Sequence, residues 1–122
     1  MQDDLLNLES DPKLYGKEPA GDLWEGKRTL MVIRLLRVAE PGERRRIERI
    51  LAQPRRERTT GEVRWMRRLI DRYECMGYAR QVALGMAGAA LHEFSLLFSG
   101  LPDSPDKQFI EALVTWVFER DH

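Results

Sequence analysis

Acidic and amide side chains near the amino terminus are the residues whose types and spacing suggest chemistry. Asp3, Asp4 and Asn7 form a D-D-x-x-N pattern. On a helix, Asp3 and Asn7 project from one side a turn apart, and Asp4 lies next to them. Oxygen ligands of this kind suit Mg²⁺, which takes one or two carboxylates together with waters and substrate phosphates. The pattern therefore indicates a metal site, although acidic residues in a first helical turn also occur only to stabilise the helix dipole.

Two lysines follow at positions that could complete such a site. Lys17 and Lys27 flank a loop that is broken by Gly16, Pro19 and Gly21. A loop of this kind can turn both ammonium groups back toward the carboxylates. Lysine binds phosphate as a point charge, and Mg²⁺ between a carboxylate and a diphosphate neutralises a leaving group. Metal-bridging acids and phosphate-binding lysines would then meet in one site.

The same stretch resembles a known family, the trans-isoprenyl diphosphate synthases or polyprenyl synthetases, which include farnesyl and geranylgeranyl diphosphate synthases. Its residues read Q-D-D-L-L-N-L-E-S-D-P-K-L-Y-G-K-E-P-A-G-D-L-W-E-G-K-R-T-L. They look like the family's second aspartate-rich motif and the G-K…D-L…G-K-R-T segment after it. More loosely, S-P-D-K-Q-F-I-E-A-L-V-T-W-V-F-E-R-D near the end looks like the family's closing helix.

The resemblance implies roles for individual residues. In that family an allylic diphosphate ionises with the help of Mg²⁺, and isopentenyl diphosphate attacks the carbocation before a proton is lost. Asp3 would then be a Mg²⁺ ligand, and Asp4 would support it directly or through water. Lys17 and Lys27 would hold the allylic diphosphate. The motif position that is usually aspartate is Asn7 here, which removes one negative charge but keeps an oxygen ligand.

The family's first aspartate-rich motif and its isopentenyl diphosphate site precede the region that this chain resembles. We therefore expect the carboxy-terminal portion of a prenyltransferase, inactive alone and dependent on an amino-terminal half. The alternative is a non-catalytic remnant, or a helical module that associates with a full-length synthase. The expected protein partner is an amino-terminal half, a full-length synthase or a second copy of this chain. Product chain length is not readable from these residues.

Composition narrows the class of protein further. The chain has 122 residues, which is the length of one domain, and it carries 20 basic and 20 acidic residues. A net charge of zero argues against nucleic acid as a partner. No apolar run approaches the roughly 20 residues of a membrane span. A single cysteine, Cys75, excludes an internal disulfide and suits the cytoplasm. We expect a cytoplasmic protein without a membrane span.

Apolar periodicity predicts an all-α fold of about six helices, and the resemblance implies the carboxy-terminal half of the isoprenoid synthase bundle. We expect one partial domain, with residues 1–29 as the binding segment and residues 30–122 as a helical scaffold. Residues 29–39 are apolar on nearly every face, which predicts a central helix. Because its neighbours in the family's bundle would be missing, this helix should leave an apolar patch exposed and drive association.

Further features are interpreted as structural. Thr29 is expected to be structural, Thr59 or Thr60 to cap a helix, and Gly77 to mark a bend. Six small residues between positions 83 and 90 predict close packing against a neighbouring helix. Cys75 is interpreted as a small buried residue. Six arginines are interpreted as a solvated charged face without an aromatic stacking platform: Arg44, Arg45, Arg46, Arg55, Arg56 and Arg58.

Overall fold

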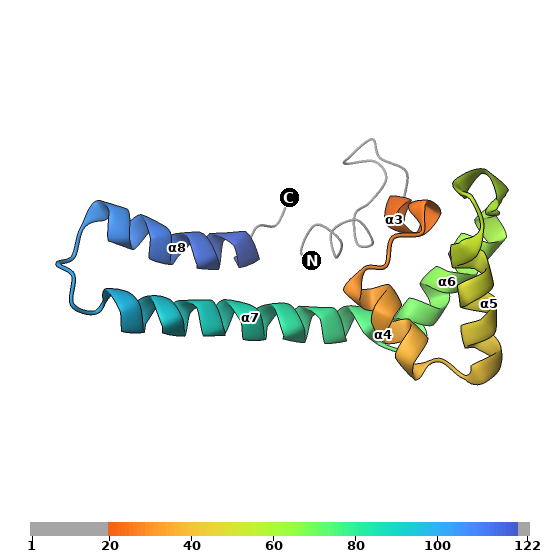
Figure 1. Cartoon of the computed structure of the whole chain (residues 1–122), viewed down its shortest axis with the longest axis horizontal. Coiled ribbons are helices and arrows are strands. Elements are labelled where there is room, and N and C mark those ends of the chain that lie inside the picture. Colours follow the sequence, from red (N-terminus) through yellow and green to blue (C-terminus); the bar gives the residue numbers. More distant parts are fainter. Residues whose placement is uncertain (1–19, 120–122) are drawn as a thin grey trace. The chain divides into compact units, whose positions relative to one another are not determined.

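The computed structural model describes residues 20–119, and this part of the chain consists of helices joined by turns and loops, without a strand (Figure 1). The predicted all-α class is confirmed. The elements are α3 (Gly21–Glu25), α4 (Leu30–Val38), α5 (Pro41–Ala52), the 3-10 helix η1 (Arg55–Glu57), α6 (Thr60–Arg72), α7 (Cys75–Phe98) and α8 (Pro105–Glu119).

The chain divides into two compact units, Met1–Arg80 and Gln81–His122, which are described separately here. The boundary between residues 29 and 30, drawn from the sequence to separate a binding segment from a scaffold, stays a prediction.

The first unit has one hydrophobic core, to which every α-helix from α3 to the start of α7 contributes. Helix α4 packs on α5 and α6, and α3 packs on α6. The core consists of buried side chains from these helices: Leu23, Met31, Val32, Leu35, Ala39, Ile47, Ile50, Val63, Met66, Leu69, Ile70, Cys75 and Ala79. The short helices α3 and α4 are too short to be stable in isolation, so this core holds them in place.

Local capping explains where the helices of this unit begin. The Thr29 side chain accepts a hydrogen bond from the backbone N–H of Val32 and starts α4, which confirms the structural role predicted for Thr29. Pro41 lies at the start of α5, where its missing N–H costs no hydrogen bond. Thr59 forms a capping box with Glu62 at the start of α6, so Thr59 is the cap and Thr60 is the first helical residue.

Helix α4 is central, as its apolar composition predicted. Met31, Val32 and Leu35 are buried, and Ile33 is the one large apolar side chain of α4 that stays exposed, at 43%. The predicted apolar patch on this helix is therefore wrong, because α5 and α6 cover it. The large apolar side chains that are exposed lie mostly on α7 and α8.

The sequence predicted a bend at Gly77, but the chain bends at Glu74 instead. Backbone hydrogen bonds from Tyr73 to Leu69 and from Glu74 to Asp71 close the end of α6. Glu74 adopts a left-handed backbone with φ of 51°, and α7 starts at the next residue. Gly77 lies inside α7. A polar residue can take this conformation at a modest cost, so no glycine was needed to mark the bend.

The second unit contains most of α7, which is followed by a turn and by α8 running back in the opposite direction (Figure 1). Ser104 accepts a hydrogen bond from the Lys107 N–H at the start of α8. Close packing was predicted for the small residues of α7. In the described part of the chain, however, no atom other than those of the adjoining residues and the helix's own nearby backbone lies within 4 Å of a Cβ built at Gly85 or Gly88, so that prediction is wrong there.

Helix α7 is the one described helix that is long and apolar enough to cross a membrane, judged by length and composition alone. Core helices of soluble proteins can meet the same two criteria. Helix α7 is therefore not clear evidence of a membrane-spanning segment.

Arg58 is buried, although the sequence placed it on a solvated face. Its guanidinium donates hydrogen bonds to the carbonyls of Ile50 and Leu51, both at 3.0 Å, of Gln53 at 2.7 Å, and of Trp24. Three of these acceptors lie at the carboxyl end of α5, where carbonyls lack helical partners and the helix dipole favours a cation. Arg58 is buried because it caps the carboxyl end of α5. The other five arginines of the two runs are exposed, as predicted.

Replacing Arg58 by methionine should destabilise the first unit. Methionine keeps an apolar stem but removes the hydrogen bonds to four carbonyls, of which only that of Ile50 keeps a backbone donor, the Gln53 N–H. We therefore expect the free energy of unfolding to fall by roughly 2–4 kcal/mol. Urea denaturation followed by far-UV circular dichroism measures this change. Arg56→Met is the matched control, because the Arg56 side chain is 85% exposed and should cost less than about 0.5 kcal/mol. Equal stability of the two variants would contradict the capping role.

Candidate diphosphate-binding site

Of the five predicted site residues, Lys27 lies in the part of the chain that the structure describes. Asp3, Asp4, Asn7 and Lys17 lie outside the described residues. Within residues 20–119, no three Asp, Glu, His or Cys side chains gather into a group that could hold a metal ion. The structure therefore characterises the lysine side of the predicted site, and the metal ligands stay a prediction.

A glycine turn between α3 and α4 positions Lys27. Gly26 ends α3 with a left-handed backbone at φ of 71°, and its N–H is bonded to the carbonyls of Asp22 and Leu23. The N–H of Lys27 then donates to the Asp22 carbonyl at 2.9 Å. Because Thr29 starts α4 two residues later, the backbone of Lys27 is held between two helix ends.

The Lys27 ammonium lies between two carboxylates. Its Nζ is 2.7 Å from Asp22 Oδ1 and 3.0 Å from Glu25 Oε2. The Asp22 side chain is 9% exposed, whereas that of Lys27 is 55% exposed. The hydrogen bond to Asp22, followed by that to Glu25, raises the pKa of Lys27 above its ordinary value. Lys27 is thus held as a cation with much of its side chain in solvent, where an anionic ligand can reach it.

The Arg58 guanidinium also presses against this turn. A Cβ placed on Gly26 would lie 2.8 Å from Arg58 Cζ and closer still to one of its nitrogens. The left-handed backbone of Gly26 is a second obstacle to any side chain there. The glycine before Lys27 is therefore required by the buried arginine. The sequence did not reveal this link, since Gly26 and Arg58 are 32 positions apart.

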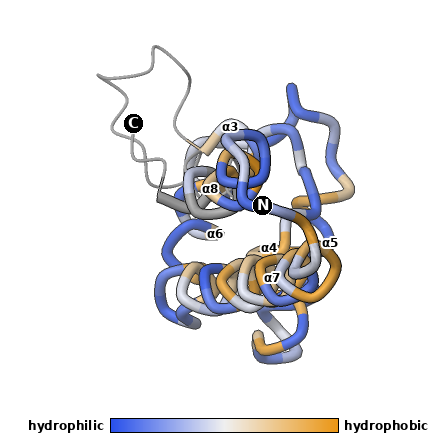
Figure 2. The backbone as a smooth tube through the Cα atoms, turned by 90° about the vertical axis from the view of Figure 1, so that its left-hand side faces the viewer, coloured by the Kyte–Doolittle hydropathy of each residue, from blue (hydrophilic) through white to orange (hydrophobic). Residues whose placement is uncertain are grey.

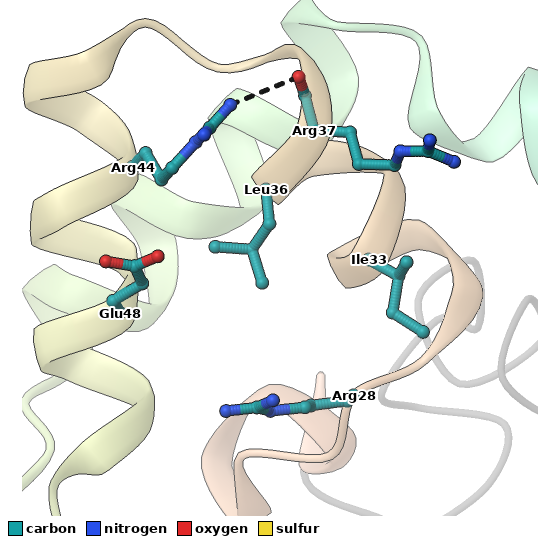
Figure 3. Close-up of a pocket in the computed structure, with 6 residues that line it drawn as sticks. All are labelled: Arg28, Ile33, Leu36, Arg37, Arg44 and Glu48. Atoms are coloured by element: carbon teal, nitrogen blue, oxygen red, sulfur yellow. Dashed lines mark hydrogen bonds between the residues drawn. The ribbon is translucent and has the colours of Figure 1, made fainter.

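Beside this turn, α4 and α5 form an open cavity of about 460 Å³ (Figure 3). Ile33 and Leu36 supply apolar walls, and Arg44 donates a hydrogen bond to the Arg37 carbonyl at 3.3 Å. Three guanidinium groups against one carboxylate give the lining a positive balance. The sequence analysis missed this cavity, because its residues come from three segments: Arg28, Ile33, Leu36, Arg37, Arg44 and Glu48.

Tryptophans accompany the arginine runs, although none was expected there. The Arg46 guanidinium lies over the Trp65 ring, 4.2 Å from its centre. Trp24 lines a second cavity together with Arg55 and Arg56. The absence of nucleic acid as a partner stays a prediction.

Cys75 is buried, as predicted, and burial raises the pKa of its thiol to about 11. The thiol is therefore protonated at neutral pH and is a poor nucleophile.

Comparison with known proteins places the chain in a family. Residues 1–70 match the family model for polyprenyl synthetase. A short chain isoprenyl diphosphate synthase from Methanothermobacter thermautotrophicus is 29% identical over 122 residues, which are 100% of this chain and 35% of the relative. A nonaprenyl diphosphate synthase from Mycobacterium tuberculosis is 31% identical over 118 residues, which are 97% of this chain and 33% of the relative. No solved structure gives a significant match.

The chain belongs to the polyprenyl synthetase family, and the resemblance found in its sequence is confirmed. It spans about a third of the length of these two relatives. The family match includes all five predicted site residues as well as the described turn at Gly26.

Replacing Lys27 by methionine should raise the pKa of Glu25. The hydrogen bond and the charge of Lys27 are the main causes that hold this pKa below its ordinary value of 4.5. Carboxyl carbon NMR measures the titration directly. Arg55→Met is the control and should shift the pKa of Glu25 less, because Arg55 lies 3.9 Å from the carboxylate.

The lowered pKa of Glu25 decides how its contribution to the stability of the fold changes with pH. Glu25 stabilises the fold above its unfolded-state pKa, and this contribution is lost as the pH falls through the lower folded-state pKa. An unchanged Glu25 titration in the Lys27→Met variant would show that the contact is not formed in solution.

Proposed function

We propose that this chain is a portion of a prenyltransferase of isoprenoid biosynthesis, acting in the cytoplasm on an allylic diphosphate and isopentenyl diphosphate. The observation that carries the proposal is the family match over residues 1–70, which includes the acidic motif and both lysines. The names of the relatives support the same chemistry, since both are isoprenyl or nonaprenyl diphosphate synthases. They differ in the product that they name, so product length is not part of the proposal.

The proposed roles follow the chemistry of each side chain. Asp3, Asp4 and Asn7 provide two carboxylates and an amide oxygen, a donor set that fits Mg²⁺, and the ion would supply positive charge to the diphosphate. Lys17 and Lys27 would bind the diphosphate oxygens. The carbon–oxygen bond of the allylic diphosphate then breaks, and diphosphate leaves with the electron pair. The double bond of isopentenyl diphosphate forms the new carbon–carbon bond, and a proton is lost.

The geometry of Lys27 supports this role in one respect. A ligand diphosphate would share or replace the contacts of Lys27 with Asp22 and Glu25. The half-exposed Glu25 is the partner more easily displaced, because Asp22 is buried and also lies closer to the ammonium. Asp22 would keep the ammonium oriented while the side facing solvent binds the ligand.

We further propose that turnover needs an amino-terminal half in addition to these 122 residues. The purified chain should not condense isopentenyl and allylic diphosphates, because only one of the two acidic motifs expected in the family is present. Transfer of labelled isopentenyl diphosphate into extractable product, assayed with Mg²⁺ and geranyl diphosphate, measures this. Mg²⁺-dependent product formation by these 122 residues alone would refute the dependence on an amino-terminal half.

Binding without turnover distinguishes this proposal from the second candidate function. We expect the chain alone to bind inorganic diphosphate in the presence of Mg²⁺, and Lys27→Ala to weaken binding about tenfold by removing a charge-assisted hydrogen bond. Isothermal titration calorimetry provides the measurement. Lys107→Ala is the matched control, since that lysine lies at the start of α8. Chelating the metal should reduce binding in every variant.

The second candidate is a non-catalytic remnant or a helical module that associates with a full-length synthase. The exposed apolar side chains of α7 and α8 favour it, because they offer a surface for another protein. Absence of Mg²⁺-dependent diphosphate binding would favour this candidate over the first.

A further inference from the structure

Two arginines of the cavity beside α4 carry charges that no carboxylate of the described residues neutralises. Arg28 precedes α4, and Arg44 lies on α5. Neither forms an ion pair within residues 20–119, where Arg55, Arg67 and Arg72 do. Guanidinium groups recognise carboxylates and phosphates through charge-assisted hydrogen bonds. Two unpaired guanidinium groups that line one cavity therefore indicate an anion-binding site.

The two arginines lie near opposite ends of α4. Thr29, the residue after Arg28, caps the start of this helix. Arg44 donates a hydrogen bond at 3.3 Å to the carbonyl of Arg37, which lies in the last turn. A helix of nine residues is about 13 Å long. Figure 3 shows Arg28 and Arg44 on opposite sides of the cavity. A ligand that reaches both arginines therefore needs a negative group at each of its ends.

Both arginines keep donors for a ligand. One terminal nitrogen of Arg44 donates to the Arg37 carbonyl, and this hydrogen bond orients the side chain. The other nitrogens of Arg44, and the whole guanidinium of Arg28, form no hydrogen bond with the described residues. In Figure 3 the side chain of Arg37 points away from Arg44, so Arg37 adds positive charge at the edge of the cavity.

Between the two arginines, the lining disfavours a further negative charge. Leu36 of α4 and Glu48 of α5 lie between them in Figure 3. Glu48 forms no ion pair with the described residues, so its carboxylate repels an anion that comes close. Ile33 is 43% exposed and extends the apolar wall that Leu36 begins. The middle of the ligand should therefore be apolar.

The size and the walls of the cavity suit a small molecule. Its volume of about 460 Å³ lies within the range of roughly 300–1,000 Å³ that is common for small-molecule sites. Its walls come from α4 and α5, which pack on each other. Figure 2 shows both hydrophilic and hydrophobic residues along the described helices, and the lining of this cavity combines the two kinds.

We propose that the cavity binds an organic dianion whose two negative groups are joined by an apolar chain. Arg28 binds one negative group and Arg44 binds the other, while Leu36 and Ile33 contact the chain. Glu48 selects against compact polyanions and against ligands with a negative charge in the middle.

This site is separate from the one proposed for diphosphate. Lys27 does not line the cavity, and its ammonium pairs with Asp22 and Glu25. Arg28 is the next residue and does line it. The turn before α4 therefore presents two adjacent cations to two different ligands. Binding of the dianion requires neither Mg²⁺ nor the acidic motif.

NMR of the arginine side-chain N–H groups tests the proposal on the full chain, in EDTA to remove metal ions. Suberate and octanoate are matched probes, because they have equal numbers of carbons and differ in the second carboxylate. We expect suberate to bind about tenfold more tightly, since it gains a second charge-assisted contact. Succinate should bind roughly tenfold more weakly than suberate, because it is too short to reach both Arg28 and Arg44.

Substitutions locate the site. Arg28→Met and Arg44→Met should each lower the affinity for suberate about tenfold, to that of octanoate. Arg45→Met is the matched control, because Arg45 is exposed on α5 beside Arg44 but does not line the cavity. Glu48→Gln should tighten suberate binding about threefold by removing a like charge. Circular dichroism checks the fold, and Arg28→Met carries the test if Arg44→Met loses helicity.

Three results would overturn the proposal. One is equal affinity for suberate and octanoate. Another is a loss of affinity in Arg45→Met equal to that in Arg28→Met, which would indicate a diffuse charged surface. The third is a set of NMR shifts confined to Lys27 and Asp22. Because these titrations contain no metal ion, whereas diphosphate binding is measured with Mg²⁺, this proposal and the proposed function can fail independently.

Discussion

The guanidinium of Arg58 is the interaction on which the first unit depends. One side chain satisfies carbonyls at the end of α5 and also reaches the Trp24 carbonyl, which lies 34 positions earlier in the chain. A buried guanidinium is tolerated only where its donors are paired, and here carbonyls at a helix end provide most of the acceptors. The same contact fixes the distance between α3 and the end of α5. The turn that carries Lys27 is therefore set by the scaffold beneath it.

Helix type and approximate position were readable from the sequence because they depend on local patterns. Apolar spacing predicted the helices, and two threonines before a helical pattern predicted the cap that Thr59 forms. The bend at Glu74 was missed, because a non-glycine residue takes the left-handed conformation there. The burial of Arg58 was missed for a different reason. Its acceptors are backbone carbonyls, which have no signature in the sequence.

The sequence also revealed only part of the candidate site. The resemblance identified Lys27 by motif, but its two carboxylate partners follow from the turn at Gly26 and not from the motif. The cavity beside α4 was missed because Arg28, Ile33 and Arg44 belong to three different segments, the turn before α4, α4 and α5, which meet only after folding. Contacts between different segments can be identified only from the folded structure, whereas the types of ligand residues and the spacing of the lysines can be read from the sequence.

Gly26 changes how the G-K-R-T segment should be interpreted in chains of this family. Its glycine is required by a neighbouring guanidinium and by its own backbone, so selection for folding alone would preserve it. Thr29 is likewise kept by the helix that it caps. A gene that had lost its enzymatic role but still encoded a folded protein would retain both Gly26 and Thr29. Among these four positions, Lys27 is the one whose loss would report on lost ligand binding.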